Sequence, residues 1–181
     1  GLGHVGGYLA QYLGDAGARL TVADLDADRL AWARDTLGAD VVAADAIYGV
    51  AADVFAPNAM GAILNDDTIP RLNACVVAGS ANNQLAEDRH GTSLADRGIL
   101  YAPDYVINAG GIISISHEGR AYNRDEAMAH CARIGDTLSE IFQRAGNEQR
   151  PTNEVADQLA EERVIAHGKA KKERRLSAVA G

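Results

Sequence analysis

The 181-residue chain is 47% hydrophobic and carries a formal net charge of −8. This length and composition suit one hydrophobic core and argue against two complete domains, so we expect a single domain over residues 1–181. The acidic charge argues against nucleic acid or an anionic membrane as a partner, because either would need a positive protein surface. A small-molecule ligand is favoured instead.

Two further features of the composition indicate a cytoplasmic protein. The sequence has no apolar run near the ~20 residues of a membrane span and no basic segment leading into an apolar one. Cys75 and Cys131 lie far apart, so they form neither a disulfide framework nor a metal-binding spacing. We therefore expect no metal site.

The first part of the chain predicts alternating helices and strands. Apolar residues at helical spacing predict a helix over 5–16 that Gly17 ends. The run 20–23 has the composition of a buried parallel strand, and Asp26 is placed to cap a helix over 27–37 that Gly38 closes. Short apolar runs recur at residues 41–42, 54–55, 76–77 and 99–101. The alternation predicts an α/β fold of the Rossmann type, with a doubly wound, mostly parallel sheet and helices on both faces.

The later part of the chain predicts helices only. Apolar spacing indicates helices over 107–117, 123–144 and 152–166. The last is followed by the basic run 169–175, which is interpreted as a solvated, frayed helix end in preference to a binding tail.

A glycine motif opens the chain. The residues Gly1, Leu2, Gly3, His4, Val5 and Gly6 form a G-x-G-x-x-G pattern, followed by a helix and then by a strand. In a dinucleotide-binding fold Gly1 permits the tight turn, Gly3 leaves room for a pyrophosphate, and Gly6 lets the helix pack close to the sheet. The helix N-terminus then holds the phosphates. His4 lies between two motif glycines, where a side chain points away from the cofactor, so we do not interpret it as catalytic.

Asp24 ends the strand that follows the glycine motif, 18 residues after Gly6. A carboxylate there accepts hydrogen bonds from the adenosine ribose and repels a 2′-phosphate, so the cofactor is predicted to be NAD. The alternative is that Asp24 only ends a strand and caps a turn. Arg29 tempers the preference for NAD over NADP, because its side chain can reach the adenine or a phosphate.

Three downstream segments extend this pattern: Asp53-Val-Phe-Ala-Pro-Asn-Ala-Met-Gly61, Val77-Ala-Gly-Ser-Ala-Asn-Asn-Gln-Leu85 and Gly98-Ile-Leu-Tyr-Ala-Pro-Asp-Tyr-Val-Ile-Asn-Ala-Gly-Gly111. With the glycine motif they resemble the glutamate/leucine/phenylalanine/valine dehydrogenase superfamily in order and spacing, through residue 163. Ser80-Ala-Asn-Asn-Gln-Leu85 and Ala121-Tyr-Asn-Arg124 are most similar to the leucine and valine enzymes. One departure is that Ala52 and Asn58 stand where the family commonly has cysteines.

The resemblance implies NAD-dependent oxidative deamination of a branched-chain L-amino acid to a 2-oxo acid and ammonia. By position, it implies that Asn82 reaches the substrate carboxylate and the nicotinamide region, and that Asn108 holds the nicotinamide carboxamide. Ala59 and Met60 would lie beside the cofactor ribose. Amide side chains suit a carboxamide because each offers a donor and an acceptor. The alternative is that Asn82 or Asn83 caps the next helix.

Ile112 and Ile115 match positions that line the substrate side-chain pocket in the family. Two β-branched residues form an apolar wall that suits an aliphatic side chain. The alternative is that both belong to the core of their helix.

The resemblance also implies what this chain lacks. The family's catalytic lysines and aspartate lie on an N-terminal domain, and this sequence has no lysine before residue 169. We therefore expect no catalytic residue in this chain, and we expect the strand before Gly1 and the N-terminal catalytic domain to be absent from it. The whole enzyme is expected to be a homo-oligomer. Two alternatives stay open: a stand-alone NAD-binding or redox-sensing regulatory module, and a phenylalanine-type amino-acid dehydrogenase.

Overall fold

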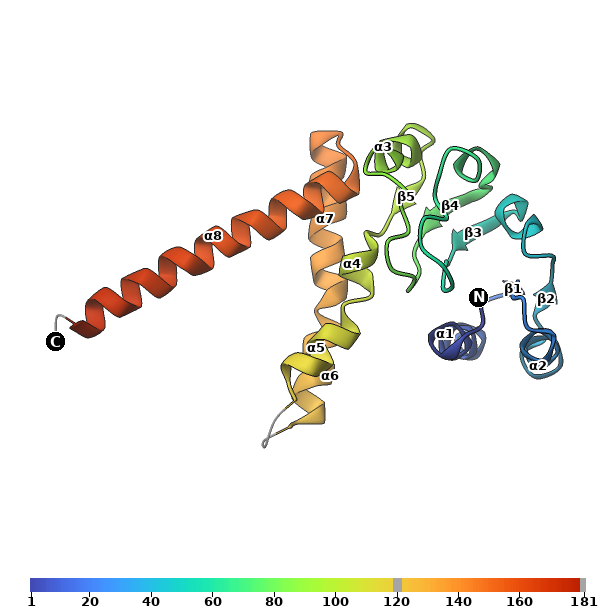
Figure 1. Cartoon of the computed structure of the whole chain (residues 1–181), viewed down its shortest axis with the longest axis horizontal. Coiled ribbons are helices and arrows are strands. Elements are labelled where there is room, and N and C mark those ends of the chain that lie inside the picture. The colour runs from blue at the N-terminus through green and yellow to red at the C-terminus, as the bar shows by residue number, and fades with distance from the viewer. Residues whose placement is uncertain (119–121, 180–181) are drawn as a thin grey trace.

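The computed structural model describes residues 1–118 and 122–179 (Figure 1). The helices are α1 His4–Asp15, α2 Ala27–Leu37, α3 Arg89–Asp96, α4 Asp104–Ile107, α5 Gly110–Ser116, α6 Arg124–Ala132, α7 Ile134–Glu148 and α8 Thr152–Val179. The strands are β1 Thr21–Val22, β2 Asp40–Val41, β3 Ala52–Phe55, β4 Ala74–Val77 and β5 Leu100–Tyr101, with 3-10 turns η1 Ala46–Gly49 and η2 Ile69–Arg71. Among the described residues, none of the helices combines the length and the apolar character needed to cross a membrane.

The N-terminal part pairs α1 and α2 with β1 and β2. Gly17, at φ +87°, follows the end of α1, and Gly38, at φ +64°, caps α2, a conformation that favours glycine. The carboxylate of Asp26 caps the start of α2 by accepting hydrogen bonds from the N–H groups of Asp28 and Arg29. These predicted helix boundaries are confirmed to within one residue.

The central part is a parallel sheet in the order β3-β4-β5. Val54 pairs with Val76, and Val76 pairs in turn with Leu100. The sheet's core contains buried residues from the strands, from α3 and from the connections between them: Leu64, Ile69, Leu72, Val77, Leu94, Ile99 and Tyr101.

The predicted α/β class with parallel strands is confirmed, but the strands form two sheets. β1 pairs only with β2, and no strand pair in the described part of the chain joins β1–β2 to β3–β5. β3 pairs with β4 along one edge, and its Val54 is 50% exposed. A buried parallel strand is covered on both sides, so β3 is incompletely covered. The N-terminus lies beside β1 (Figure 1), and Gly1 packs on Ala59 in the loop after β3.

The C-terminal part is helical, as predicted, with different boundaries. The helix expected over 107–117 is two helices, α4 and α5, separated by Asn108 and Ala109. The helix expected over 123–144 is interrupted at Arg133, where ψ is −8°. The last helix, expected to end at residue 166, continues to Val179, and it projects away from the other elements (Figure 1).

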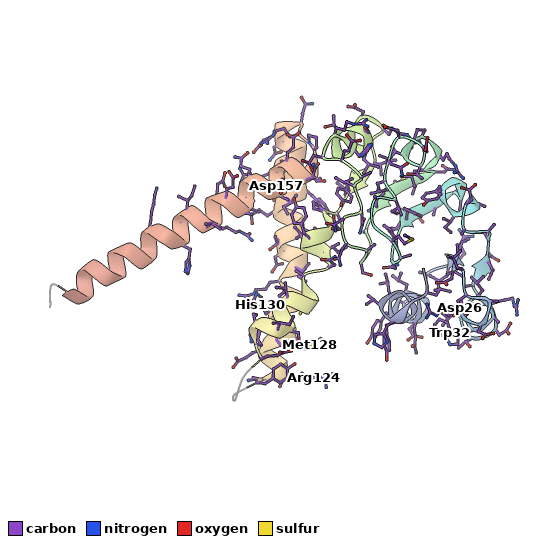
Figure 2. All side chains as sticks on the ribbon, in the orientation of Figure 1. Asp26, Trp32, Arg124, Met128, His130 and Asp157 are labelled. Atoms are coloured by element: carbon purple, nitrogen blue, oxygen red, sulfur yellow. The ribbon has the colours of Figure 1, made fainter. Side chains whose placement is uncertain are left out.

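A separate core joins the last two helices. Ile141 and Ala145 of α7 pack against Val155, Ala156 and Leu159 of α8. The hydroxyl group of Tyr105 in α4 donates a 2.6 Å hydrogen bond to Asp157, which lies where α8 passes α7 (Figure 2). These contacts hold α4, α7 and the start of α8 together, next to the end of β5.

Candidate functional site

Asp24 is bonded directly to the glycine loop. The N–H of Leu2 donates a 2.5 Å hydrogen bond to Oδ2 of Asp24, and the N–H of Asp26 donates to Oδ1 at 2.9 Å. Burial acts to raise the pKa of Asp24, but the hydrogen bonds from Leu2 and Asp26 outweigh it and the pKa is lowered. Asp24 therefore does cap a turn, and in addition it fixes the glycine loop as a charged carboxylate.

The motif glycines differ in the space around them. A Cβ on Gly6 would lie 2.1 Å from the carbonyl oxygen of Gly1, and a Cβ on Gly1 would lie 2.6 Å from Cβ of Ala59. Around Gly3 the nearest atom to such a Cβ is Nη1 of Arg29, at 3.8 Å. Gly1 and Gly6 thus allow close packing, whereas Gly3 leaves an open approach to the backbone that a guanidinium group borders. That arrangement suits a phosphate.

His4 and Val5 belong to the helix and not to the loop before it. His4 is the first residue of α1, and its ring packs edge-on against Tyr8 at 5.1 Å. Val5 is 57% exposed. The side chain of His4 therefore packs on its own helix.

The loop after β3 connects the glycine motif to the loop after β4. Ala59 contacts Gly1, and a Cβ on Gly61 would lie 2.8 Å from the carbonyl oxygen of Asn82. Met60, between them, is 72% exposed. The predicted residues Ala59 and Met60 thus lie between the glycine loop and Asn82.

Asn82 and Asn108 are in direct contact. Nδ2 of Asn108 donates to Oδ1 of Asn82 at 2.5 Å and to the carbonyl oxygen of Ser80 at 3.3 Å. The carbonyl of Ser80 can only accept, which fixes the orientation of the Asn108 amide. The pair therefore offers a donor, Nδ2 of Asn82, and an acceptor, Oδ1 of Asn108. The alternative role of Asn82 as a helix cap is wrong, because the next helix, α3, begins at Arg89.

Ile112 and Ile115 lie on the solvent side of α5. They are 68% and 61% exposed, whereas Ile113, between them, is 9% exposed. The alternative that they form the core of their helix is therefore wrong. They are free to contact a ligand or another part of the protein.

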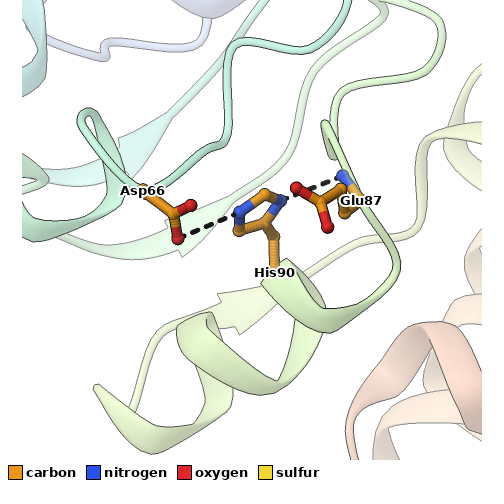
Figure 3. Close-up of side chains that lie close together, drawn as sticks. All are labelled: Asp66, Glu87 and His90. Carbon is orange, nitrogen blue, oxygen red and sulfur yellow. Dashed lines mark hydrogen bonds and ion pairs between the residues drawn. The ribbon is translucent and has the colours of Figure 1, made fainter.

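His90 lies between Asp66 and Glu87 (Figure 3). Its Nδ1 accepts a 2.9 Å hydrogen bond from the N–H of Glu87, which places the proton on Nε2, 3.4 Å from Oδ1 of Asp66. Arg89 donates to both oxygens of Asp66, at 2.7 and 2.6 Å. Both ring nitrogens of His90 and the carboxylate of Asp66 thus already have polar partners within the protein. The cluster cross-links the segment before η2 to the start of α3.

Three polar residues near the asparagine pair have structural roles that the sequence patterns do not predict. Asn58, Gln84 and Asp104 each bond to the segment that carries Asn82. Their signal in the sequence is weak: each is a polar residue in a motif whose neighbours are apolar or small.

Comparisons with known proteins agree with this arrangement. The model of the Glutamate/Leucine/Phenylalanine/Valine dehydrogenase family matches residues 24–170. Leucine dehydrogenase from Geobacillus stearothermophilus is 46% identical over 94% of this chain and 47% of its own length. Phenylalanine dehydrogenase from Bacillus thermotolerans is 43% identical over 93% of this chain and 46% of its own. The chain thus spans about half the length of these curated relatives.

Solved structures show the same relationship. The crystal structure of L-tryptophan dehydrogenase from Nostoc punctiforme matches with a TM-score of 0.90 and 42% identity, over 93% of this chain and 51% of that one. A hetero-hexameric glutamate dehydrogenase from Thermus thermophilus shares the fold, with a TM-score of 0.66 at 21% identity, over 90% of this chain and 44% of that one. The resemblance drawn from the sequence motifs is confirmed: the chain belongs to the Glutamate/Leucine/Phenylalanine/Valine dehydrogenase family.

Proposed function

We propose that this chain is the NAD-binding part of an amino-acid dehydrogenase that oxidatively deaminates a branched-chain L-amino acid to the 2-oxo acid and ammonia. The observation that carries the proposal is the bonded pair Asn82–Asn108. It lies next to a continuous row of loops that leads back through Gly61 and Ala59 to the glycine motif. In an α/β sheet, ligands bind at the carboxyl ends of the strands, where these loops lie.

The glycine loop, the end of β1 and the asparagine pair offer matching groups for the pyrophosphate, a ribose and the carboxamide of a dinucleotide. The open backbone at Gly3 and the guanidinium of Arg29 suit the pyrophosphate, and the second lone pairs of the Asp24 carboxylate suit ribose hydroxyls. The charge of Asp24 disfavours a 2′-phosphate, which supports NAD over NADP. The free donor of Asn82 and the free acceptor of Asn108 complement a carboxamide. Bound there, the nicotinamide ring would accept a hydride from Cα of the amino acid.

The exposed pair Ile112 and Ile115 supports an aliphatic substrate. Their side chains add an apolar wall after Asn108 along the chain, and a branched aliphatic side chain buries surface against such a wall. A phenylalanine-type enzyme is the second candidate, supported by relatives named phenylalanine dehydrogenase at 43% to 46% identity.

The proton chemistry is proposed to lie in the other half of the whole protein. The relatives are about twice as long as this chain, and the sequence has no lysine before residue 169. We further propose that a strand of that other half lies between β1 and β3, whose edges there are unpaired in the described residues. The whole protein is proposed to be a homo-oligomer.

The test compares the whole protein with the 181-residue chain. NADH formation is measured by absorbance with leucine, valine, isoleucine and phenylalanine in turn, and NAD binding is measured by calorimetry. We expect the whole protein to favour the branched-chain amino acids, and the 181-residue chain to bind NAD without turnover. Turnover by the 181-residue chain alone would contradict the proposed division of chemistry. Failure of the whole protein to bind NAD would contradict the proposed function. Faster NADH formation with phenylalanine than with the branched-chain amino acids would contradict the branched-chain assignment.

A further inference from the structure

The segment Gly79–Gln84, which carries Asn82, is held by polar side chains from three directions. It follows β4 without helical or strand structure of its own, and its backbone is hydrogen-bonded to neighbouring loops at Ala81, Asn83 and Gln84. Asn83 within it has φ +51°, an uncommon conformation for a residue other than glycine. Side-chain contacts add to these backbone bonds in holding that conformation.

Asp104 supplies the first of these contacts. Its carboxylate, 8% exposed, accepts a 2.8 Å hydrogen bond from the N–H of Asn83 and a 2.7 Å bond from the hydroxyl group of Tyr101. Burial, and then the hydrogen bond to Asp104, raise the pKa of Tyr101 far above its ordinary value, so the phenol remains a donor. Thr152 of α8 donates to the carbonyl oxygen of Tyr101 at 2.7 Å. The carboxylate is thus fixed from β5 and α8, and it fixes Asn83.

Asn58 supplies the second contact, from the loop after β3. Its Oδ1 accepts from the N–H of Ser80 at 3.0 Å and from the hydroxyl group of Ser80 at 2.7 Å, and its Nδ2 donates to Ala56. The carbonyl oxygen of the same Ser80 accepts from Asn108.

Gln84, the last residue of the segment, forms hydrogen bonds back to its first half. It is fully buried, and its Nε2 donates to the carbonyl oxygens of Gly79 and Ala81 at 2.8 and 2.9 Å. Gly79 packs so closely on the loop after β3 that a Cβ would lie 2.2 Å from the carbonyl oxygen of Pro57. The buried residues Ala81 and Gln84 therefore flank the two exposed asparagines and anchor both ends of their turn.

We propose that Asp104 and Asn58 are positioning residues that hold the segment Gly79–Gln84 so that Asn82 meets Asn108 in the geometry that binds a nicotinamide carboxamide. The inference rests on the proposed function, since it names what orders that site. It assigns no direct ligand contact to either residue. Both bond to the segment that carries Asn82, and neither forms a hydrogen bond with the glycine loop or with Asp24 in the described residues. Asn58 packs on Gly6 through its Cβ, which Asn58→Ala keeps.

The test separates the two ends of the cofactor by using two probes, NAD and ADP-ribose. ADP-ribose has the phosphates and riboses of NAD and lacks the nicotinamide ring. Affinities of the whole protein for both are measured by calorimetry, for wild type, Asp104→Ala and Asn58→Ala. We expect each variant to bind NAD about tenfold more weakly, the scale of one or two lost hydrogen bonds, and ADP-ribose within about twofold of wild type. We expect kcat to fall with NAD affinity, because the ring is no longer oriented.

Two further variants complete the design. Asp96→Ala removes an exposed carboxylate on α3 and is expected to leave both affinities unchanged. Asp104→Asn is expected to recover part of the NAD affinity, because its amide oxygen can still accept from the N–H of Asn83. The inference is overturned if Asp104→Ala and Asn58→Ala behave like Asp96→Ala, if ADP-ribose affinity falls with NAD affinity, or if Asp104→Asn is no better than Asp104→Ala. If wild type itself does not bind NAD, the proposed function fails instead.

Discussion

The N–H of Leu2 and the carboxylate of Asp24 lie 2.5 Å apart, which joins the glycine loop to the end of β1 through one charged hydrogen bond. The same carboxylate accepts a hydrogen bond from the N–H of Asp26, the N-cap residue of α2. One side chain therefore fixes the loop, the strand end and the helix start relative to one another, and it keeps lone pairs that a ribose can use.

Replacing Asp24 with asparagine tests its charge. Asp24→Asn keeps an oxygen that can accept from Leu2 but removes the negative charge that disfavours a 2′-phosphate. We expect the ratio of NAD to NADP affinity in the whole protein to fall about tenfold, the scale of one charged contact. Fluorescence titration with NADH and NADPH measures it. Asp28→Asn, an exposed neighbour on α2, is the control, and an unchanged ratio in Asp24→Asn would contradict the role.

Gly91 and Gly146 predict opposite effects of alanine. A Cβ on Gly91 would lie 2.0 Å from Oδ1 of Asn153, a buried residue of α8 that donates to Asp88, so Gly91→Ala should destabilise the protein by about 1–3 kcal/mol. A Cβ on Gly146 in α7 meets nothing within 4 Å. Gly146→Ala should therefore stabilise the protein by about 0.5–1 kcal/mol. Urea unfolding measures both. A stabilising effect of Gly91→Ala would show that the contact between α3 and Asn153 is not tight, and a destabilising effect of Gly146→Ala would contradict the open space beside α7.

The pair of Asp66 and Arg89 predicts a pH dependence. The hydrogen bonds from Arg89 lower the pKa of Asp66 to about 2. A lowered pKa in the folded state means that this carboxylate stabilises the protein above its ordinary pKa of 3.8 and loses that effect as the pH falls toward 2. Asp66→Asn should therefore lower the unfolding temperature slightly at pH 5 and much less at pH 2.

Salt and a neighbouring residue provide the checks on Asp66. Both members of the pair are more than half exposed, so the difference at pH 5 should shrink in 1 M salt, where the Debye length is about 3 Å. Asp67→Asn, at the adjacent exposed position, should show no such change between pH 5 and pH 2. If Asp66→Asn and Asp67→Asn shift the unfolding temperature equally at both pH values, the ion pair does not contribute.

Shortening the exposed isoleucines of α5 should change substrate preference. If Ile112 and Ile115 form the pocket wall, Ile112→Ala and Ile115→Ala make room for a ring. The ratio of kcat/KM for phenylalanine to that for leucine in the whole protein should then rise about tenfold or more. Ile113→Val, on the buried side of the same helix, should lower stability by about 0.5–1.5 kcal/mol and leave the ratio unchanged. An unchanged ratio in both alanine variants would remove these residues from the pocket.

Local residue chemistry predicts the N-terminal half well. Gly17, Asp26 and Gly38 each determine a helix end through their own backbone or side chain, so their effects can be derived from the sequence alone. The runs of apolar residues likewise identify the five strands that the structure shows within residues 1–118 and 122–179.

The sequence predicts less where long-range contacts decide. The pattern does not predict α3, whose buried face includes His90 and Gly91 in place of large apolar residues. The interruption at Arg133 carries no proline that would indicate it, whereas the one at Asn108 stands beside the pair Gly110-Gly111. Asn58 and Asp104 act on residues 22 and 21 positions away, Ser80 and Asn83, and such pairings emerge only when the strands are placed side by side.

The division of the strands into two sheets has a consequence for how the chain melts. The glycine loop belongs to the β1–β2 half and the asparagine pair to the β3–β5 half, and no strand ladder in the described residues couples them. A ligand that binds to both halves would couple their unfolding. Its binding free energy would then appear as cooperativity between the halves as well as added stability. A single sharp transition with NAD, in place of two broad ones without it, would make the shape of the melting curve a direct gauge of occupancy.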